Sequence, residues 1–462
     1  MSLEQATDTT KDQFLEIVQT EDVLQIREFL NNQNISDVAE LIDELPDYES
    51  QIIGNMSTHR AASTFKILDV PTQKRIIQEL PAFKTAELLN DLSADDRTSF
   101  LEELPSEVVK ELIKTLDPEE RKITLSLLGY PESSVGRLMT PDYIAVEKDW
   151  TVKEVIDHIR EVGKDSETID VIYVVDEKGY FIDDIRIREI ILANPDKKIE
   201  DVIDNRYIAL HVNDDQETAS EAFKMNNRVA LPVLDNNNIL LGIITIDDVL
   251  WVAQEEFTED IQKIGGTEAL DEPYLEIPLM KLFKKRIVWL VVLFLGEMLT
   301  ATAMGYFEDE IAKAVVLSLF VPLIISSGGN SGSQASTLII QAMALGEITI
   351  ADWWRVVRRE ILSGLLLGTV LGIIGFARIM LWNQIFHTYG IHSVLIATTV
   401  GFSLVGVVLW GTLAGSMLPI VLKKFGADPA TSSAPFVATL VDVTGLVIYF
   451  SVAFLFMRGI LL

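Results

Sequence analysis

An isolated aspartate, Asp442, lies near the C-terminus of this 462-residue chain, inside a long apolar segment. It is the only charged residue from Phe436 to Phe456. A carboxylate at the depth of a lipid bilayer costs about 2.5 to 3.5 kcal/mol, so it is expected to have a function and a partner. The segment offers no lysine or arginine as that partner. A passing cation would neutralise the charge, and the sequence therefore predicts an ion pathway.

A second polar stretch, Pro322–Ser336, interrupts another apolar segment with the sequence PLIISSGGNSGSQAS. At 100° per residue of helix, small residues recur on one of its faces, which would let a second helix approach closely. Amides and a threonine lie on nearly the opposite face and could form hydrogen bonds. The small face holds Gly328, Gly332 and Ser336, and the polar face holds Asn330, Gln334, Thr337 and Gln341. Alternatively the amides only join helices, but this would leave Asp442 unexplained.

The ligands available to a cation here are all oxygen atoms, which favours Mg²⁺, Ca²⁺ or Mn²⁺ over soft metals. One carboxylate per chain cannot replace the water shell of a hard ion, and Mg²⁺ usually keeps several waters, so hydrated Mg²⁺ fits best. Thr439 adds polarity near Asp442, and Pro435 would leave the carbonyl of Thr431 without its helical donor and bend the segment. Glu297 is a second acid at membrane depth, and an ion ligand and a protonated hydrogen-bond donor are equally consistent with it.

Five apolar segments must position these residues, and each meets the requirement of about 20 residues for a membrane span. They cover about 286–306, 312–345, 355–380, 391–422 and 433–458. Basic residues precede the first and third spans and follow the fourth, which predicts a cytoplasmic N-terminus and a C-terminus outside. Residues 281–462 hold 12 Lys and Arg against 9 Asp and Glu, whereas residues 1–280 hold 26 against 60. The strongly acidic composition of residues 1–280 excludes nucleic acid as a partner. It is consistent with binding of metal cations, or with a role in solubility alone.

Several classes of protein are excluded by what the sequence lacks. The chain has no cysteine, which excludes disulfides, zinc–thiolate sites and thiol chemistry. It has no phosphate-binding P-loop motif and no N-terminal signal peptide, so the first 280 residues are expected in the cytosol. No paired acids, nucleophile with its base or metal triad suggests catalysis, and the chain is predicted not to be an enzyme.

The front part divides by pattern. Residues 1–130 predict an acidic helical domain, because Glu-Leu-Pro recurs at 44–46, 79–81 and 103–105 and each proline can end one helix and begin the next. Residues 172–189 match residues 231–248 at an offset of 59, each as two β-rich runs around a polar turn. Apolar residues then have helical spacing over 247–270, with Gly265-Gly266 as a plausible end.

These residues together resemble the MgtE-type magnesium channel/transporter family over essentially the whole chain. The most specific motifs are PLIISSGGNSGSQASTLIIQA (Pro322–Ala342) and PFVATLVDVTGLVIY (Pro435–Tyr449). The resemblance implies a multidomain fold: an all-α superhelical N-domain (1–130), α/β tandem CBS domains (131–200 and 201–250), a connecting or plug helix (251–280), and an α-helical polytopic membrane domain with five transmembrane helices (281–462).

The resemblance also implies a homodimer in the plasma membrane, with one pore lined by the second and fifth spans. Mg²⁺ would flow passively inward and, by binding the acidic cytosolic domains, would also close the pore. Implied Mg²⁺ contacts in the pore are Asp442, the backbone oxygen of Ala438, and Asn330. Outside the pore they are Asp215, Glu217, Asp248, Glu259 and Asp260, with Asp95 and Asp96 added without a family match. The pore-lining residues predicted are Gly328, Gly329, Gly332, Gln334, Glu297, Pro435 and Thr439.

The chain departs from the family pattern at Trp251 and Asn227, which replace sensing acids, and at Ala434, which replaces a polar residue. Some relatives bind ATP between the CBS domains. Arg188 and Glu189 fit that cofactor site, whereas Val171 replaces an aromatic residue. Two rival functions remain: transport of Co²⁺ or Mn²⁺, which ion competition would reveal, and an anchored nucleotide sensor, which would bind adenine nucleotides tightly without needing the pore acid.

Overall fold

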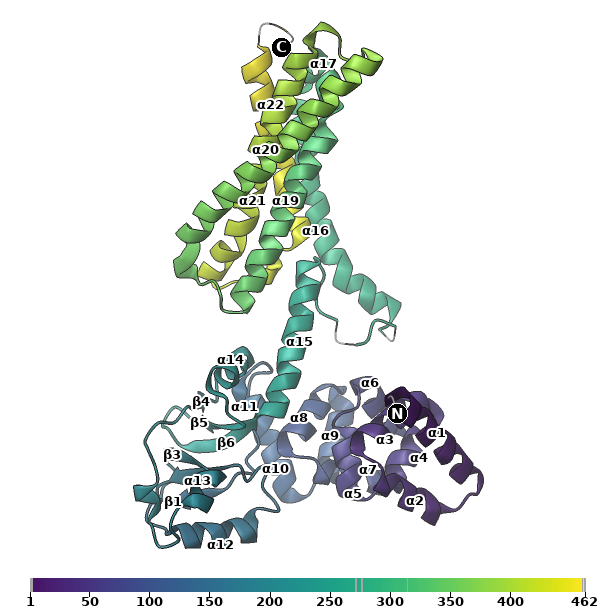
Figure 1. The fold of residues 1–462 in the computed structure, drawn as a ribbon. Coiled ribbons are helices and arrows are strands. Elements are labelled where there is room, and N and C mark those ends of the chain that lie inside the picture. The colour runs from purple at the N-terminus through teal and green to yellow at the C-terminus, as the bar shows by residue number, and fades with distance from the viewer. Residues whose placement is uncertain (1–2, 271, 276, 314, 459, 461–462) are drawn as a thin grey trace. The chain divides into compact units, whose positions relative to one another are not determined.

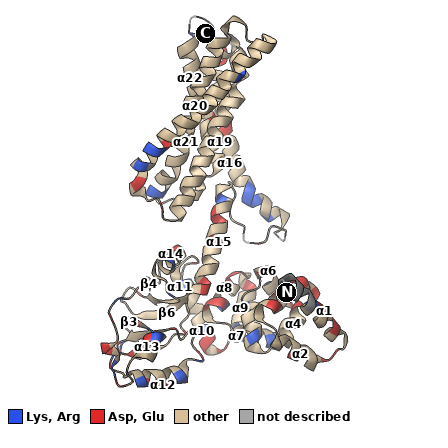
Figure 2. Cartoon of the chain, in the orientation of Figure 1, with Lys and Arg blue, Asp and Glu red and all other residues tan. Residues whose placement is uncertain are grey.

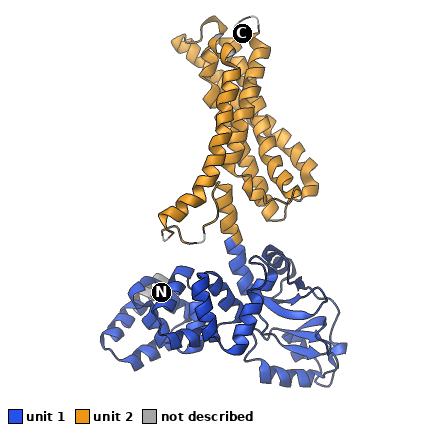
Figure 3. Ribbon diagram, turned by 180° about the vertical axis from the view of Figure 1, so that it is seen from behind, with its two compact units in different colours: residues 1–255 blue, residues 256–462 orange. Residues whose placement is uncertain are grey.

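The computed structural model describes residues 3–270, 272–275, 277–313, 315–458 and 460 (Figure 1). The chain forms two compact units, residues 1–255 and 256–462, and the division falls within one helix, α15 (Ile246–Ile264) (Figure 3). Unit 1 consists of short helices and two small sheets, and unit 2 consists mainly of long helices. This arrangement confirms the multidomain fold class that the sequence predicts.

Short helices fill the first half of unit 1, as the Glu-Leu-Pro pattern predicts. Pro46 and Pro118 occupy first positions of helices, and Pro81 and Pro105 directly precede two others. These are positions that a residue without a backbone N–H tolerates. The elements are α1 (Leu3–Gln19), α2 (Val23–Asn32), α3 (Ile35–Glu44), η1 (Pro46–Tyr48), α4 (Glu49–Asn55), α5 (Thr58–Phe65), α6 (Val70–Glu79), α7 (Ala82–Asp91), α8 (Ala94–Glu102), α9 (Ser106–Thr115) and α10 (Pro118–Leu127).

Two three-stranded sheets follow, and their pairing repeats at the predicted offset of 59 residues. Val171 lies opposite Arg186 in the first sheet, and Ala230 lies opposite Thr245 in the second. In each sheet the first two strands are parallel and the last two antiparallel. The elements are α11 (Val135–Leu138), β1 (Ala145–Glu147), α12 (Val152–Val162), β2 (Val171–Val175), β3 (Phe181–Arg186), α13 (Ile187–Leu192), η2 (Ile199–Asp201), β4 (Leu210–His211), α14 (Gln216–Asn226), β5 (Ala230–Leu234) and β6 (Leu240–Thr245).

The connecting helix α15 is shorter than the range 247–270 expected from apolar spacing. It ends at Ile264, directly before Gly265-Gly266. Gly266 has a φ of +75°, a left-handed conformation that ends a helix and that glycine adopts without strain. Gly265 and Gly266 therefore end α15, and the next helix begins at Leu279, directly after Pro278.

Among the described residues, five helical segments of unit 2 are long and apolar enough to cross a membrane. The predicted second span, 312–345, contains the end of α17, all of α18 and all of α19, and Pro322 lies in the first turn of α19. The elements are α16 (Leu279–Tyr306), α17 (Glu308–Lys313), α18 (Val315–Ser318), α19 (Val321–Ala344), η3 (Ile350–Asp352), α20 (Trp353–Phe386), η4 (Gly390–His392), α21 (Ser393–Lys424), η5 (Pro429–Thr431) and α22 (Ala434–Met457).

Helix α21 packs against α19, α20 and α22. Lys and Arg gather near the starts of α16 and α20, at one end of unit 2 (Figure 2). The α20–α21 contact is close because glycines meet backbone there: a β-carbon on Gly368 would lie 2.8 Å from Cα of Val405. Membrane helices gain from such contacts because lipid supplies no hydrophobic force between them.

Candidate cation sites

Asp442 lies where α22 packs against α19. A β-carbon placed on Gly329 of α19 would lie 3.6 Å from Oδ1 of Asp442 and 3.5 Å from Cα of Ala438. Asp442 and Ala438 therefore lie directly against α19 at Gly329, although a methyl group would still fit there. Asp442 remains partly exposed, so it is accessible from one side. The structure thus brings together three residues that the sequence places in one pore, Gly329, Ala438 and Asp442.

The small-residue stripe of α19 packs against neighbouring helices, as its spacing predicts. A β-carbon on Gly328 would lie 2.5 Å from Val407, and one on Gly332 would lie 2.9 Å from the backbone oxygen of Gly411. Both are shorter than real contacts, so larger residues would push α19 and α21 apart. Of the three glycines predicted to line a pore, Gly329 contacts Asp442, whereas Gly328 and Gly332 serve this close packing.

The opposite face of α19 is polar and less covered. Asn330 and Gln334 are exposed in unit 2, and the Asn330 amide lies 3.5 Å from the hydroxyl of Ser326. Ser333, Gln334, Thr337 and Leu338 line a hollow of about 420 Å³. The exposed lining of this hollow is mostly apolar, so the hollow by itself does not indicate a cation site.

Serine hydroxyls of α19 hold the beginning of α22. Ser333 donates to the carbonyl of Ala434 at 2.9 Å, and the buried Ser336 donates to the carbonyl of Ser432 at 2.9 Å. The expected bend at Pro435 is wrong: α22 begins at Ala434, so Pro435 lies in its first turn, where the missing N–H breaks no helical bond. Thr439 uses its hydroxyl to bond the carbonyl of Pro435 at 3.1 Å.

Glu297 lies on an exposed part of α16. The preceding residue, Gly296, packs against α22, since a β-carbon there would lie 2.9 Å from Cγ2 of Thr439. Thr439 is three residues before Asp442, so α16 packs against α22 within one helical turn of each acid. The second acid of the membrane region therefore faces the same neighbourhood as the first.

The end of α15 carries a mixed-charge cluster within unit 2. Glu259 and Asp260 were predicted from the sequence; Lys263 and Asp428 were not. Lys263 Nζ lies 2.5 Å from Oε1 of Glu259 and 2.8 Å from Oδ2 of Asp428. Asp428 belongs to the connection between α21 and α22. Burial and Asp428 raise the pKa of Asp260, and Lys263 opposes this rise. The sequence does offer one signal for Asp428: it is an acid followed by a proline in the short connection between the fourth and fifth spans.

Asp95, Asp96 and Asp248 form an acidic cluster in unit 1. Their carboxylates offer ligand atoms within 4.8 Å of one another, the only group of three or more metal-ligating residues found in the described part of the chain. Asp95 is 6% exposed, and its Oδ1 is buried without a hydrogen-bond partner. Burial, followed by the charge of Asp248, raises the pKa of Asp95 well above its ordinary value. A buried, unpartnered carboxylate oxygen among two further acids fits a hard divalent cation.

A lysine also lies in this cluster, and sequence reasoning did not find it. Lys66 Nζ is 3.3 Å from Oδ2 of Asp96 and 3.7 Å from Oδ2 of Asp247. Burial raises the pKa of Asp248 to about 7, and Asp247 and Asp96 add to the rise. One ammonium among several carboxylates leaves the cluster with an excess of negative charge.

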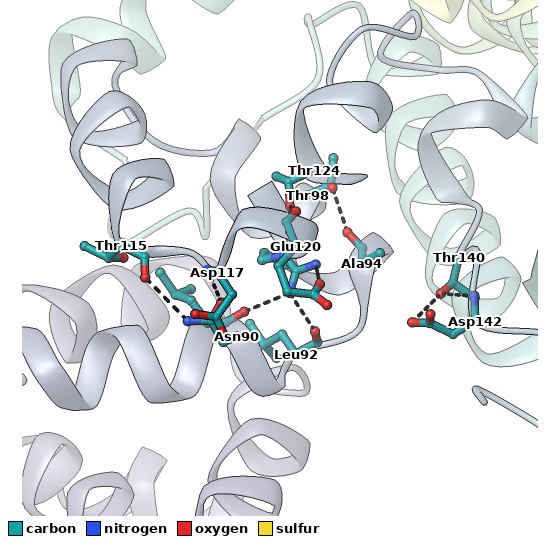
Figure 4. A network of polar contacts seen from close by, with 12 residues as sticks. Asn90, Leu92, Ala94, Thr98, Thr115, Asp117, Glu120, Thr124, Thr140 and Asp142 are labelled. Atoms are coloured by element: carbon teal, nitrogen blue, oxygen red, sulfur yellow. Dashed lines mark hydrogen bonds and ion pairs between the residues drawn. The ribbon is translucent and has the colours of Figure 1, made fainter. Parts of the chain in front are cut away.

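A buried arginine holds the helix that presents Asp95 and Asp96. The guanidinium of Arg97, which has no exposed surface, donates to the hydroxyl of Thr124 at 2.9 Å and to the carbonyls of Leu89 and Leu92 at 3.1 Å. It also pairs with Glu120. Figure 4 shows Leu92, Glu120 and Thr124 gathered at this point. The network fixes α8 against α10 and so positions the two acids.

The remaining predicted residues lie apart from these groups. Asp215 is the N-cap of α14, and its carboxylate accepts the N–H of Glu217 at 2.9 Å; both residues are exposed. Capping explains Asp215 without an ion. Arg188 and Glu189 are exposed on α13, whereas Val171 is buried in β2.

Comparison with known proteins matches the same regions. A family model described as a divalent cation transporter, MgtE, matches residues 321–452. Models for the MgtE intracellular N domain and the CBS domain match 33–133, and 135–196 with 199–255. A magnesium transporter MgtE from Thermus thermophilus is 39% identical over 335 residues, 72% of this chain and 72% of the relative. The chain belongs to the MgtE family.

One further relative of this MgtE-family chain matches nearly its whole length, and one solved structure matches about half of it. A magnesium transporter MgtE from Bacillus subtilis is 28% identical over 459 residues, 95% of this chain and 98% of the relative. The crystal structure of the cytosolic domain of the Mg²⁺ channel MgtE in complex with ATP is 32% identical with a TM-score of 0.51, and the match covers 52% of this chain and 99% of that one. The relatives are transporters, which confirms the prediction that the chain is not an enzyme.

Proposed function

We propose that this chain is a Mg²⁺ channel that lets Mg²⁺ flow passively into the cell. The observation that carries the proposal is the position of Asp442 against Gly329, next to Ala438. A single accessible carboxylate, a neighbouring backbone and a polar helix face suit an ion that keeps most of its water. The names of the relatives, which are magnesium transporters, select Mg²⁺ among the hard divalent ions.

The pore lies between two copies of the chain. The polar face of α19, with Asn330 and Gln334, is exposed in one copy, and a second copy would supply a matching face and a second Asp442. The basic residues at the starts of α16 and α20 favour a cytoplasmic N-terminus and a C-terminus outside the cell. We therefore assign the chain as a plasma-membrane homodimer.

The membrane potential is a sufficient driving force. A divalent cation moving inward through 100 mV gains about 4.6 kcal/mol, because each charge contributes ~2.3 kcal/mol. At about 1.36 kcal/mol per decade, this supports a concentration ratio of about three decades. Entry needs no motor, but it does need a gate.

Acidic groups at both ends of α15 are the proposed gate. Asp248, in its first turn, belongs to the cluster with Asp95 and Asp96, and Glu259 and Asp260 lie near its end. At low Mg²⁺ the carboxylates repel one another; at high Mg²⁺ the cation bridges them and holds the closed arrangement. Asp215 and Glu217 would add an exposed contact in the second CBS domain.

Glu297 is proposed as a second acid of the pore. Its helix contacts α22 at Gly296, next to Glu297, against Thr439, three residues before Asp442. The variant Glu297→Gln should raise the Mg²⁺ concentration that half-saturates flux, with maximal flux less affected. An unchanged half-saturating concentration would remove Glu297 from the pathway.

Arg188 and Glu189 are the proposed contacts for an adenine nucleotide. The likeness to a cytosolic domain crystallised with ATP supports this site. Val171 offers no aromatic ring for stacking, so we expect weaker ATP binding than a site with an aromatic residue there would give. Calorimetric titration of wild type and Arg188→Met with ATP tests the assignment, and equal affinity in the two proteins would remove Arg188 from the site.

Mg²⁺ uptake into proteoliposomes tests the main proposal. Wild type, Asp442→Asn and the control Asp309→Asn, at an exposed acid outside the long helices, would be compared while internal Mg²⁺ is varied. Uptake that needs Asp442 but not Asp309, and that stops as internal Mg²⁺ rises, supports both pore and gate. Equal uptake by all three proteins would exclude the assigned pathway. Competition with Co²⁺ and Mn²⁺ separates the rival ions, and an anchored nucleotide sensor would show no uptake.

A further inference from the structure

A lysine ammonium occupies the acidic group at the end of α15. Lys263 Nζ lies 2.5 Å from Glu259, one helical turn earlier, and 2.8 Å from Asp428, which is 165 residues later in the chain. The Lys263 side chain is 27% exposed. One ammonium thus bridges two carboxylates that belong to distant parts of the chain.

The carboxylates themselves are held in place. Asp428 directs Oδ1 to the N–H of Ala430 at 2.8 Å, which leaves Oδ2 for the lysine. Asp260 is half-buried beside them, and the charge of Asp428 acts on it. Glu259, Asp260 and Asp428 carry three negative charges against the single positive charge of Lys263. The group thus retains attraction for a further cation, although its bridging position is already taken.

We propose that Lys263 is a tethered competitor of Mg²⁺, and that it sets the Mg²⁺ concentration at which this group closes the channel. The inference rests on the proposed function, in which Glu259 and Asp260 bind regulatory Mg²⁺. A bridging divalent ion and the ammonium claim the same oxygens of Glu259 and Asp428. Mg²⁺ must either displace the lysine or bind despite repulsion by its positive charge. The lysine therefore raises the Mg²⁺ concentration that is required to close the channel. Because the competing lysine is part of the chain, its local concentration does not change. The Mg²⁺ concentration that closes the channel is therefore a fixed property of the protein.

The same relationship recurs independently in unit 1. Lys66 lies 3.3 Å from Asp96 and 3.7 Å from Asp247, beside the cluster of Asp95, Asp96 and Asp248. The two acidic groups at the ends of α15 thus each contain one lysine that partly neutralises them.

The test uses the full-length protein in proteoliposomes and measures the internal Mg²⁺ that half-inhibits Mg²⁺ uptake. Lys263→Met removes the charge and keeps a stem of similar length; Lys263→Gln serves if the methionine variant is unstable. The expected result is a half-inhibiting concentration lowered by about three- to tenfold, because two partly exposed ion pairs are lost as competitors. Lys263→Arg retains the charge and should stay near wild type. Lys424→Met is the matched control, since it removes an exposed lysine of the same unit.

The outcomes separate the two hypotheses. If wild-type uptake does not respond to internal Mg²⁺ at all, the proposed gate fails, whatever the lysine variants do. If wild type responds but Lys263→Met and Lys263→Gln keep its half-inhibiting concentration, the competitor role is overturned. A higher half-inhibiting concentration also overturns it, because Lys263 would then hold the closed contact together. Mg²⁺-dependent thermal stabilisation of the same variants gives a second readout of affinity, independent of transport.

Discussion

The indole of Trp289 donates a hydrogen bond of 3.0 Å from Nε1 to Oγ of Ser433. Trp289 belongs to the first membrane helix, and Ser433 is the N-cap of the last, where its hydroxyl also accepts the N–H of Phe436. Gly266 lies against the same ring, since a β-carbon there would be 2.8 Å from Cδ1 of Trp289 and 3.3 Å from Cγ of Pro435. The chain that follows α15 therefore meets α16 and α22 at one indole.

The variant Trp289→Phe should loosen this junction. Phenylalanine keeps an apolar ring but cannot donate to Ser433, and losing one such bond costs about 1 kcal/mol. We expect a lower midpoint of thermal unfolding in detergent and a higher internal Mg²⁺ concentration for half-inhibition of uptake. The control Trp353→Phe, at an exposed tryptophan of α20, should leave both values near wild type. An unchanged midpoint and threshold would show that the junction carries no coupling.

Two glycine variants separate ion contact from helix packing. In Gly329→Ala the new methyl lies at ordinary contact distance, 3.5 to 3.6 Å, from Ala438 and Asp442. In Gly415→Ala it would lie 2.1 Å from the backbone oxygen of Gly332, which cannot move without shifting α19. We expect Gly329→Ala to fold normally with reduced Mg²⁺ uptake, and Gly415→Ala to lose about 1 to 3 kcal/mol of stability.

Thermal unfolding and uptake, measured on the same preparations, distinguish the two effects. Gly346→Ala serves as a control for the exposed surface, although its φ of +73° makes alanine mildly strained there. Uptake by Gly329→Ala equal to wild type would mean that Asp442 does not contact the ion at this level of the pore.

Local patterns made much of this fold predictable from sequence. The offset of 59 residues foretold two sheets with the same strand register, because alternation and turn chemistry act over short distances. The four-residue spacing of Gly328, Gly332 and Ser336 foretold a packing face for the same reason. Asp442 was found because an unpaired charge in an apolar span is costly.

Long-range ion pairs could not be read in the same way. Lys263 and Asp428 are 165 residues apart, and although the proline after Asp428 marks that acid, nothing in the sequence marks Lys263 as its partner. Lys66 reaches Asp247 only because nine α-helices, α6 to α14, and two sheets fold between them. Pro435 was misread because its effect depends on where a helix begins, and boundaries are set by tertiary contacts such as those of Ser333 and Ser336.

Arg97 should be needed to hold the acidic cluster of unit 1 in place. Arg97→Met removes the donor to Thr124 and to two carbonyls and leaves Glu120 without its partner, at a cost of about 3 kcal/mol. We expect weaker Mg²⁺ stabilisation as well, because Asp95 and Asp96 lose their position. Urea unfolding of residues 1–255, with and without Mg²⁺, measures both effects.

The control for Arg97 is Arg121→Met. Arg121, like Arg97, donates to backbone carbonyls, in its case those of Ile113, Lys114 and Leu116. It does not hold the helix that carries the acids of the cluster. We expect this variant to lose stability while its stabilisation by Mg²⁺ remains. Equal Mg²⁺ responses in the two variants would show that Arg97 does not position the cluster.

Glu167 should make the stability of unit 1 depend on pH. Burial, followed by the charge of Asp95, raises the pKa of Glu167 to about 7. The folded state then holds this proton more tightly than the unfolded state, so its contribution to stability falls as pH rises from about 4.5 to about 7 and stays level above. Glu167→Gln should be nearly neutral at pH 5, where wild type is protonated, and stabilising at pH 8.

Unfolding of residues 1–255 by urea in a chelator, at pH values from 5 to 8, measures this difference. The control Glu161→Gln changes an exposed acid of α12 and should show no such trend. Mg²⁺ should stabilise wild type more at pH 8 than at pH 5, because protons and Mg²⁺ compete for the same carboxylates. A Glu167→Gln effect that is the same at both pH values would mean that Glu167 is ionised throughout, and that burial does not govern its charge.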